Sequence, residues 1–62
     1  MDELNLVPYS VDYKGNRFTI EYWKGTPLGH VWNDIKSFYL PGDIVSITDT
    51  SGKSMTFMKG MC

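Results

Sequence analysis

Few side chains in this sequence are of types that carry out chemistry, and their spacing does not bring them together. His30 is the one histidine, and it falls on the polar face of a predicted helix without a neighbouring nucleophile. A general base must lie within hydrogen-bond reach of the group it deprotonates, and Ser37 lies two turns further along. Cys62 ends the sequence, so its thiol lacks preorganised surroundings. We therefore expect neither side chain to be catalytic.

Two further patterns resemble catalytic motifs without meeting their requirements. Asp12 and Glu21 are expected on the solvated outer face of a sheet, without the pocket that acid–base chemistry by paired carboxylates requires. Gly25 and Gly29 flank the start of the helix, but the lysine of a phosphate-binding loop is missing. One histidine and one cysteine cannot complete a four-ligand zinc site. We expect a protein that is not an enzyme and that binds neither metal nor cofactor.

The composition is that of one small globular domain. The chain has 62 residues, 42% of them hydrophobic, and a net charge of -1. We expect residues 1–62 to form a single compact domain, in which residues 1–7 are either flexible or an added strand and residues 60–62 are a tail. The single cysteine excludes an internal disulfide. No apolar run approaches the roughly 20 residues that span a bilayer, so we expect a cytoplasmic protein without membrane contact.

The first regular segment is predicted to be a hairpin. Apolar and polar residues alternate on both sides of Gly15-Asn16, which is typical of two strands joined by a two-residue turn. That turn predicts three facing pairs, all on one side of the sheet: Tyr13 with Phe18, Val11 with Ile20, and Tyr9 with Tyr22.

An amphipathic helix is predicted next. Thr26 is placed as the N-cap and Pro27 at the first helical position, where its missing N–H costs nothing. Pro41-Gly42 ends the segment. Its apolar stripe has helical spacing and comprises Leu28, Val31, Trp32, Ile35, Phe38 and Tyr39.

A second hairpin is predicted to complete the fold. The loop Thr50-Ser51-Gly52 places glycine third and pairs Ile47 with Met55 and Val45 with Phe57. The fold class is α+β: a ββαββ antiparallel sheet with one amphipathic helix packed on one face. About sixteen apolar residues, ten from strands and six from the helix, are predicted to form its core.

Several apolar side chains remain outside that core. Trp23 falls on the polar face of its strand, and Ile44 and Met58 face each other on the wrong side of the second hairpin. Leu4, Leu6, Val7 and Met61 lie in the flanks. These residues either form a patch that binds a partner or a second copy of the chain, or are covered by the ends of the chain.

One segment resembles a known family. Glu21-Tyr22-Trp23-Lys24-Gly25-Thr26-Pro27-Leu28 is similar to the segment E-Y-x-K-G-x-x-L of the short uracil-DNA glycosylase inhibitor proteins of Bacillus tailed phages. In both, it lies where the second strand runs into the only helix. The resemblance implies a compact homodimer, with a sheet and one helix per subunit, that fills the DNA-binding cleft of the glycosylase as a DNA mimic.

The resemblance also implies which residues bind the partner. Glu21, Tyr22 and Lys24 match the family's segment, with Trp23 between them. In the family, an aromatic residue followed by an acid early in the helix makes much of the contact. The nearest equivalent pair here is Trp32 and Asp34, which is displaced along the helix and has one residue too many in its spacing. A second C-terminal strand and a net charge of only -1 also depart from the family's pattern.

Three hypotheses about function follow. The first is a small phage-type protein-binding inhibitor that blocks a host enzyme by stoichiometric occlusion, with uracil-DNA glycosylase as the most concrete target. The second is a non-catalytic structural or homo-oligomerisation module. The third is a protein that binds single-stranded nucleic acid through Lys14, Arg17, Trp23 and Lys24, which the acidic net charge disfavours.

Overall fold

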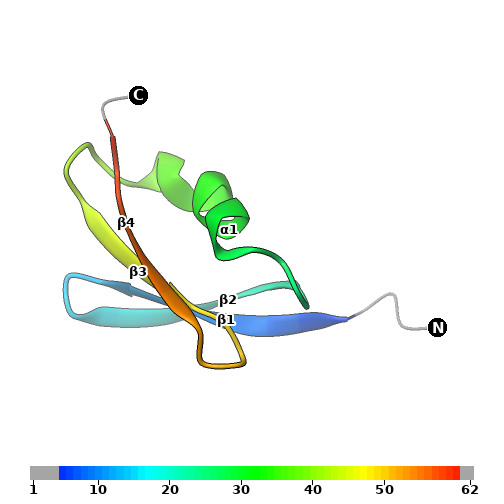
Figure 1. Cartoon of the computed structure of the whole chain (residues 1–62). Coiled ribbons are helices and arrows are strands. Elements are labelled where there is room, and N and C mark those ends of the chain that lie inside the picture. Colours follow the sequence, from blue (N-terminus) through cyan, green and yellow to red (C-terminus); the bar gives the residue numbers. More distant parts are fainter. Residues whose placement is uncertain (1–4, 61–62) are drawn as a thin grey trace.

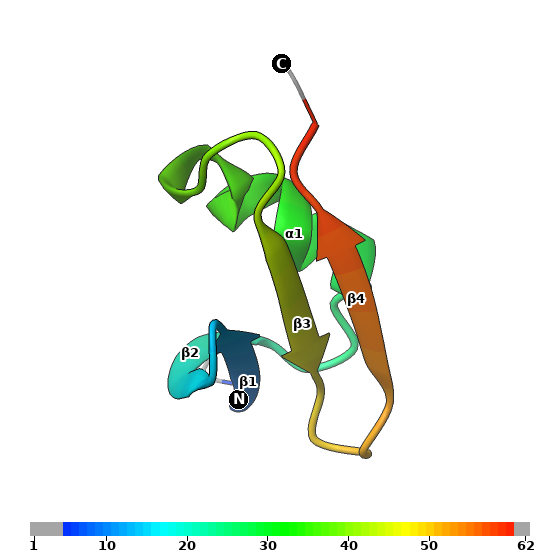
Figure 2. The same ribbon diagram turned by 90° about the vertical axis from the view of Figure 1, so that its left-hand side faces the viewer.

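The computed structural model describes residues 5–60 and contains a four-stranded antiparallel sheet with one short helix. The elements are β1 (Leu6–Tyr13), β2 (Asn16–Trp23), α1 (Leu28–Ile35), a 3₁₀ turn η1 (Lys36–Phe38), β3 (Ile44–Thr48) and β4 (Ser54–Met58). The strand order is β2-β1-β3-β4, and α1 lies over one face of the sheet (Figures 1 and 2). The predicted α+β class and ββαββ order are confirmed.

The two hairpins join through their first strands. β1 pairs with β3, with Tyr13 opposite Val45 and Val11 opposite Ile47. The helix carries the chain from β2, at one edge, to β3 in the middle of the sheet. β1 extends further than β3, because the pairing ends at Ser10 and Thr48 while β1 begins at Leu6.

The turn of the first hairpin lies one residue earlier than predicted, and the pairing is offset by two. Lys14 and Gly15 have φ values of 51° and 81°, and Tyr13 faces Asn16. A turn with positive φ at both central residues matches the twist of the strands, and it places glycine second rather than first. Val11 therefore faces Phe18, and Tyr9 faces Ile20. An even offset leaves every side chain on its predicted face.

The second hairpin forms as predicted. Val45 faces Phe57 and Ile47 faces Met55, and Gly52 has the positive φ of 93° that its loop position requires. Asp49 holds the loop, since its Oδ1 accepts hydrogen bonds from the N–H groups of Ser51 and Lys53 and from the Ser51 hydroxyl. The hydrogen bond from the Ser51 hydroxyl is the main cause that lowers the pKa of this carboxyl.

The helix begins one residue later than predicted, at Leu28, and ends earlier than its apolar stripe. Pro27, with extended backbone, is the N-cap, and the Thr26 hydroxyl instead donates to the carbonyl oxygen of Trp23 at 2.6 Å. A residue before proline is disfavoured in helical conformation. After Ile35 the chain tightens into η1, which turns Phe38 outward with 81% of its surface exposed. The predicted place of Phe38 in the core is wrong.

The buried core is narrower than predicted. Its seven members come from the two central strands and the helix: Tyr9, Val11, Leu28, Val31, Ile35, Val45 and Ile47. Phe18 and Met55 face the same side but remain 43% and 45% exposed. They lie on the edge strands, in one row with Val11 and Ile47. The eight-residue helix shields the middle of that row and leaves both ends open.

Neighbours in this row should differ sharply in their contribution to stability. Ile47→Ala removes a fully buried side chain and should lower the free energy of unfolding by about 2–5 kcal/mol. Met55→Ala, directly opposite on the edge strand, should cost less than about 1 kcal/mol. Urea unfolding of the two variants measures both values. Equal losses would contradict a core confined to the central strands.

Acid should weaken the fold through Asp43 and Asp49. The N–H of Leu40 and the hydroxyl of Tyr13 donate to Asp43 at 2.9 Å and lower the pKa of its carboxyl. The unfolded chain therefore takes up protons first, so this stability is complete above the ordinary pKa of 3.8 and is lost as the pH falls through the lower folded value. Urea unfolding at several pH values below about 5 should show this loss, and less of it in Asp43→Asn and Asp49→Asn. Stability that does not change over that range would contradict the assignment.

Candidate functional site

A hollow of about 350 Å³ lies between the end of β2 and the exposed side of α1. Its lining comprises Leu6, Glu21, Tyr22, Trp23, Thr26, His30 and Asp34, and we name it the β2–α1 hollow. It lies at an edge of the sheet, because among residues 5–60 β2 has a neighbouring strand, β1, on one side only. A partner can therefore reach it without displacing another element.

Local sequence places these side chains. Alternation along β2 sends Tyr22 to the helix side of the sheet and Glu21 and Trp23 to the other side. Gly25, with φ of 86°, turns the chain, and the N–H of Thr26 donates to the carbonyl oxygen of Trp23 at 3.1 Å. This tight turn brings the helix start back beside the strand that precedes it.

Asp34 is the polar centre of the hollow. Its Oδ2 accepts a hydrogen bond from the Tyr22 hydroxyl at 3.1 Å, and the His30 Nε2 lies 3.9 Å from the same oxygen. His30 and Asp34 are one helical turn apart, so they share a face of α1. Burial, followed by the contact with Asp34, raises the pKa of Tyr22. The Asp34 side chain remains 46% exposed, which leaves it open to a cation from a partner.

The structure brings together four of the six residues predicted to bind a partner. Glu21, Tyr22, Trp23 and Asp34 all line the β2–α1 hollow. Trp32 does not, because its indole stacks on Phe57 at 5.4 Å and on Tyr39 at 6.0 Å between ring centroids. The core therefore holds this side chain.

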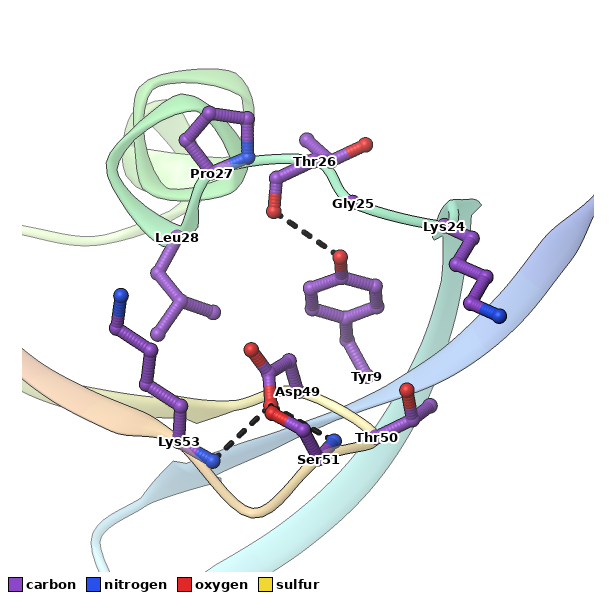
Figure 3. Close-up of a pocket in the computed structure, with 10 residues that line it drawn as sticks. All are labelled: Tyr9, Lys24, Gly25, Thr26, Pro27, Leu28, Asp49, Thr50, Ser51 and Lys53. Atoms are coloured by element: carbon purple, nitrogen blue, oxygen red, sulfur yellow. Dashed lines mark hydrogen bonds between the residues drawn. The ribbon is translucent and has the colours of Figure 1, made fainter.

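Lys24 lines a different hollow, of about 290 Å³, between the start of α1 and the β3–β4 loop (Figure 3). The hydroxyl of Tyr9 crosses it to donate to the carbonyl oxygen of Thr26 at 3.0 Å. Lys53 extends beside Leu28, whereas Lys24 lies on the other side of Tyr9 (Figure 3). Asp49, at the base, is engaged in its own loop. The two lysines therefore do not converge on a common anion.

Three residues of the β2–α1 hollow were not predicted as site residues: Leu6, Thr26 and His30. His30 was assigned to plain surface, although its spacing of four from Asp34 places both on one helical face. Leu6 belongs to a segment whose structure was left open, and it extends β1 to lie opposite Trp23. The structure thus assigns residues 6 and 7 to a strand, while Leu4, Met61 and Cys62 lie outside the described residues.

The apolar residues on the sheet face away from the helix do not form one patch. Leu6 and Trp23 face each other at one end, and Ile44 and Met58 at the other. Polar rows separate the two pairs, and in one of them Arg17 Nε donates to Asp12 Oδ1 at 2.9 Å. Only the pair of Leu6 and Trp23, with Trp23 54% exposed, adjoins the β2–α1 hollow.

Within residues 5–60, no three histidine, cysteine, aspartate or glutamate side chains gather in a way that could hold a metal ion. No helix in that part of the chain is long and apolar enough to cross a membrane. Comparisons with protein-family models, with curated proteins and with solved structures find no match to the chain.

The contact between Tyr22 and Asp34 should be visible in the titration of Tyr22. Because the negative charge of Asp34 disfavours the phenolate, Asp34→Ala should lower the pKa of Tyr22 towards its ordinary value of 10.0. Burial of Tyr22 is unchanged in this variant, so part of the rise in its pKa should remain. NMR titration of the Tyr22 ring protons measures this, with the pKa of Tyr39 as an internal control, since burial and Tyr13, not Asp34, raise it. An unchanged Tyr22 pKa would contradict the contact.

Proposed function

We propose that this protein is a small, non-catalytic inhibitor of phage type that blocks a host enzyme by stoichiometric occlusion. Its binding site is the β2–α1 hollow, and uracil-DNA glycosylase is the most concrete target. The proposal places it in the host cell cytoplasm, where such an enzyme acts.

The observation that carries the proposal is the combination of charge and exposed apolar surface at one edge. The carboxylates of Glu21 and Asp34 line the same hollow, and none of the described residues that line it is a lysine or arginine. Beside them Trp23 and Leu6 are 54% and 40% exposed. Exposed tryptophan is the kind of side chain that dominates binding energy at protein interfaces. Carboxylates next to it favour a partner surface that carries positive charge.

The DNA-binding cleft of a glycosylase is such a surface. Enzymes of this class grip phosphates with positive side chains and accept a flipped base in a pocket. On this proposal Glu21 and Asp34 stand in for phosphates, and Trp23 supplies the apolar contact that Trp32, held in the core, cannot make. The segment that resembles the phage inhibitors, residues 21–28, forms the strand end and helix start that flank the hollow.

A uracil-excision assay tests the proposal. The protein at a tenfold molar excess should abolish excision, and titration should end at a fixed stoichiometry. Trp23→Ala should weaken inhibition by about tenfold or more. Its matched control is Met58→Ala, which removes a similarly exposed side chain, 68% exposed, from the opposite end of the same sheet face.

Charge should matter separately from shape. Asp34→Asn keeps a hydrogen-bond acceptor for Tyr22 while removing the charge, and should weaken inhibition by about threefold to tenfold. Asp34→Lys should weaken it further. Ser54→Lys, on the far edge strand, adds positive charge away from the hollow and should have no effect. Absence of inhibition by the unaltered protein would dispose of the glycosylase as target.

A different target would appear in a pull-down from bacterial lysate. The proposal requires one stoichiometric protein that the unaltered chain retains and Trp23→Ala loses. A second candidate function, a structural or homo-oligomerisation module, is favoured by the open edge of β2.

A further inference from the structure

The most exposed apolar side chains lie where η1 runs into β3, at the end of the sheet opposite Leu6 and Trp23. We name residues 39–43 the η1–β3 turn. Phe38, just before it, and Leu40, within it, are 81% and 72% exposed, the highest values for large hydrophobic residues within residues 5–60. The turn, the start of β3 and the end of β4 lie together at this end (Figures 1 and 2).

The turn holds these two side chains outward. Tyr39, between them, has extended backbone and packs its ring inward, 4.8 Å from the ring of Tyr13 and 6.0 Å from that of Trp32 between centroids. Phe38 and Leu40 are therefore directed away from the core on either side of this anchor. Their exposure belongs to a fixed conformation, so a partner would not have to order them on binding.

The backbone of the turn has no N–H group left without an acceptor. Residue 41 is a proline and has no N–H. The other four N–H groups donate within the chain at 2.9–3.1 Å: Tyr39 to Lys36 O, Leu40 to Asp43 Oδ2, Gly42 to Lys59 O and Asp43 to Leu40 O. A turn that faces water does not need this, whereas an unpaired donor is costly in hydrocarbon. The turn is thus suited to a surrounding that offers no acceptors.

Positive charge surrounds the turn. Lys14 lies close to Asp43, because its charge adds to the hydrogen bonds that lower the pKa of this carboxyl. The Nζ of Lys59 donates to the carbonyl oxygen of Lys36 at 2.9 Å, which brings two further lysines to the start of η1. The carboxylate of Asp43 is occupied by the N–H of Leu40 and by a tyrosine hydroxyl. Three lysines therefore exceed the one carboxylate that holds the turn.

We propose that the η1–β3 turn docks on an anionic lipid surface. Phe38 and Leu40 enter the boundary between head groups and acyl chains, and Lys14, Lys36 and Lys59 contact the lipid phosphates. A protein partner would need a pocket for each projecting side chain, whereas a fluid bilayer makes room for both. The expectation of no membrane contact considered spanning segments only, and a turn that enters one leaflet does not need one.

The acidic β2–α1 hollow favours the same orientation. An anionic surface repels the carboxylates of Glu21 and Asp34 and attracts the lysines around the turn. No residue of the turn lines the hollow, so a chain docked through the turn keeps the hollow available to another protein. The inference therefore goes beyond the proposed inhibition and does not depend on it.

Co-sedimentation of the full chain with vesicles tests the docking. Vesicles of phosphatidylcholine with about one-third phosphatidylglycerol should bind at least about tenfold more tightly than phosphatidylcholine alone, and added salt should weaken the binding. Replacing both apolar side chains, by Phe38→Ser and Leu40→Ser, should weaken it by about tenfold or more. The matched control replaces the exposed pair at the other end, by Leu6→Ser and Trp23→Ser, and should have no effect.

The lysines should act in the same way according to their position. Lys14→Gln and Lys36→Gln should each weaken binding to the anionic vesicles by about fivefold. Lys24→Gln and Lys53→Gln, around the other hollow, remove the same charge away from the turn and should change it little. Circular dichroism shows that each variant is folded.

A polarity-sensitive dye reports whether the turn enters the lipid. Ser37 is exposed beside Phe38, so a dye on Ser37→Cys, in a chain whose own thiol is removed by Cys62→Ser, should shift to the blue on anionic vesicles. The same dye on Thr19→Cys, on the edge strand β2, should not shift.

Three outcomes would overturn the proposal. Absence of binding at about 1 mM anionic lipid would leave the turn to a protein partner. Equal loss in the two pairs of serine variants would place the contact elsewhere. A dye at residue 37 that does not shift would exclude insertion. These measurements contain no enzyme and the excision assay contains no lipid, so failure of one proposal is distinct from failure of the other.

Discussion

The short ladder between β1 and β3 is the contact on which the rest of the structure depends. It pairs only residues 10–13 with residues 45–48, yet it joins two hairpins that would each be marginal alone. Its inward side chains, Val11, Val45 and Ile47, are fully buried. A 62-residue chain with one cysteine has no cross-link to support this junction. The helix therefore serves mainly to keep water from these few side chains.

Aromatic contacts extend this small core towards the edge of the sheet. Trp32 stacks nearly parallel to Phe57, and Tyr39 meets Tyr13 edge-on at 4.8 Å between ring centroids. The Tyr13 hydroxyl then reaches Asp43, which holds the chain between η1 and β3. These rings carry much buried area per residue, which suits a chain of this length. They also explain why Trp32 is unavailable to a partner whereas Trp23 is exposed.

The fold was predictable because side-chain alternation and glycine positions constrain it strongly. The second hairpin forms with its predicted register, and α1 buries Leu28, Val31 and Ile35 of its predicted stripe. The first turn was predicted one residue too late because Gly15 fits either central position of a two-residue turn. Both choices put every side chain on the same face of the sheet, so alternation does not distinguish them. Phe38 has helical spacing, but periodicity cannot reveal where a helix tightens.

The candidate site was harder to predict, since it depends on how the strand end and the helix approach each other. Glu21, Tyr22 and Trp23 are neighbours in sequence, but the approach of Asp34 depends on the turn at Gly25 and on the angle of α1. His30 carries no signal beyond its spacing from Asp34. Leu6 joins the hollow only because β1 continues past the end of β3, and the length of a strand beyond its partner is not encoded in alternation.

That overhang gives the two ends of the sheet different mechanical support. Residues 10–13 of β1 are held between β2 and β3, whereas residues 6–8 pair with β2 alone. Beyond them, the N–H of Lys24 donates one further hydrogen bond to the carbonyl oxygen of Asn5. Pro8 fits there, because its missing N–H faces a side where β3 has already ended. The overhang can open on its own while the buried junction stays intact. Leu6 and Trp23 thus lie on the part of the sheet best able to adapt its shape to an incoming surface.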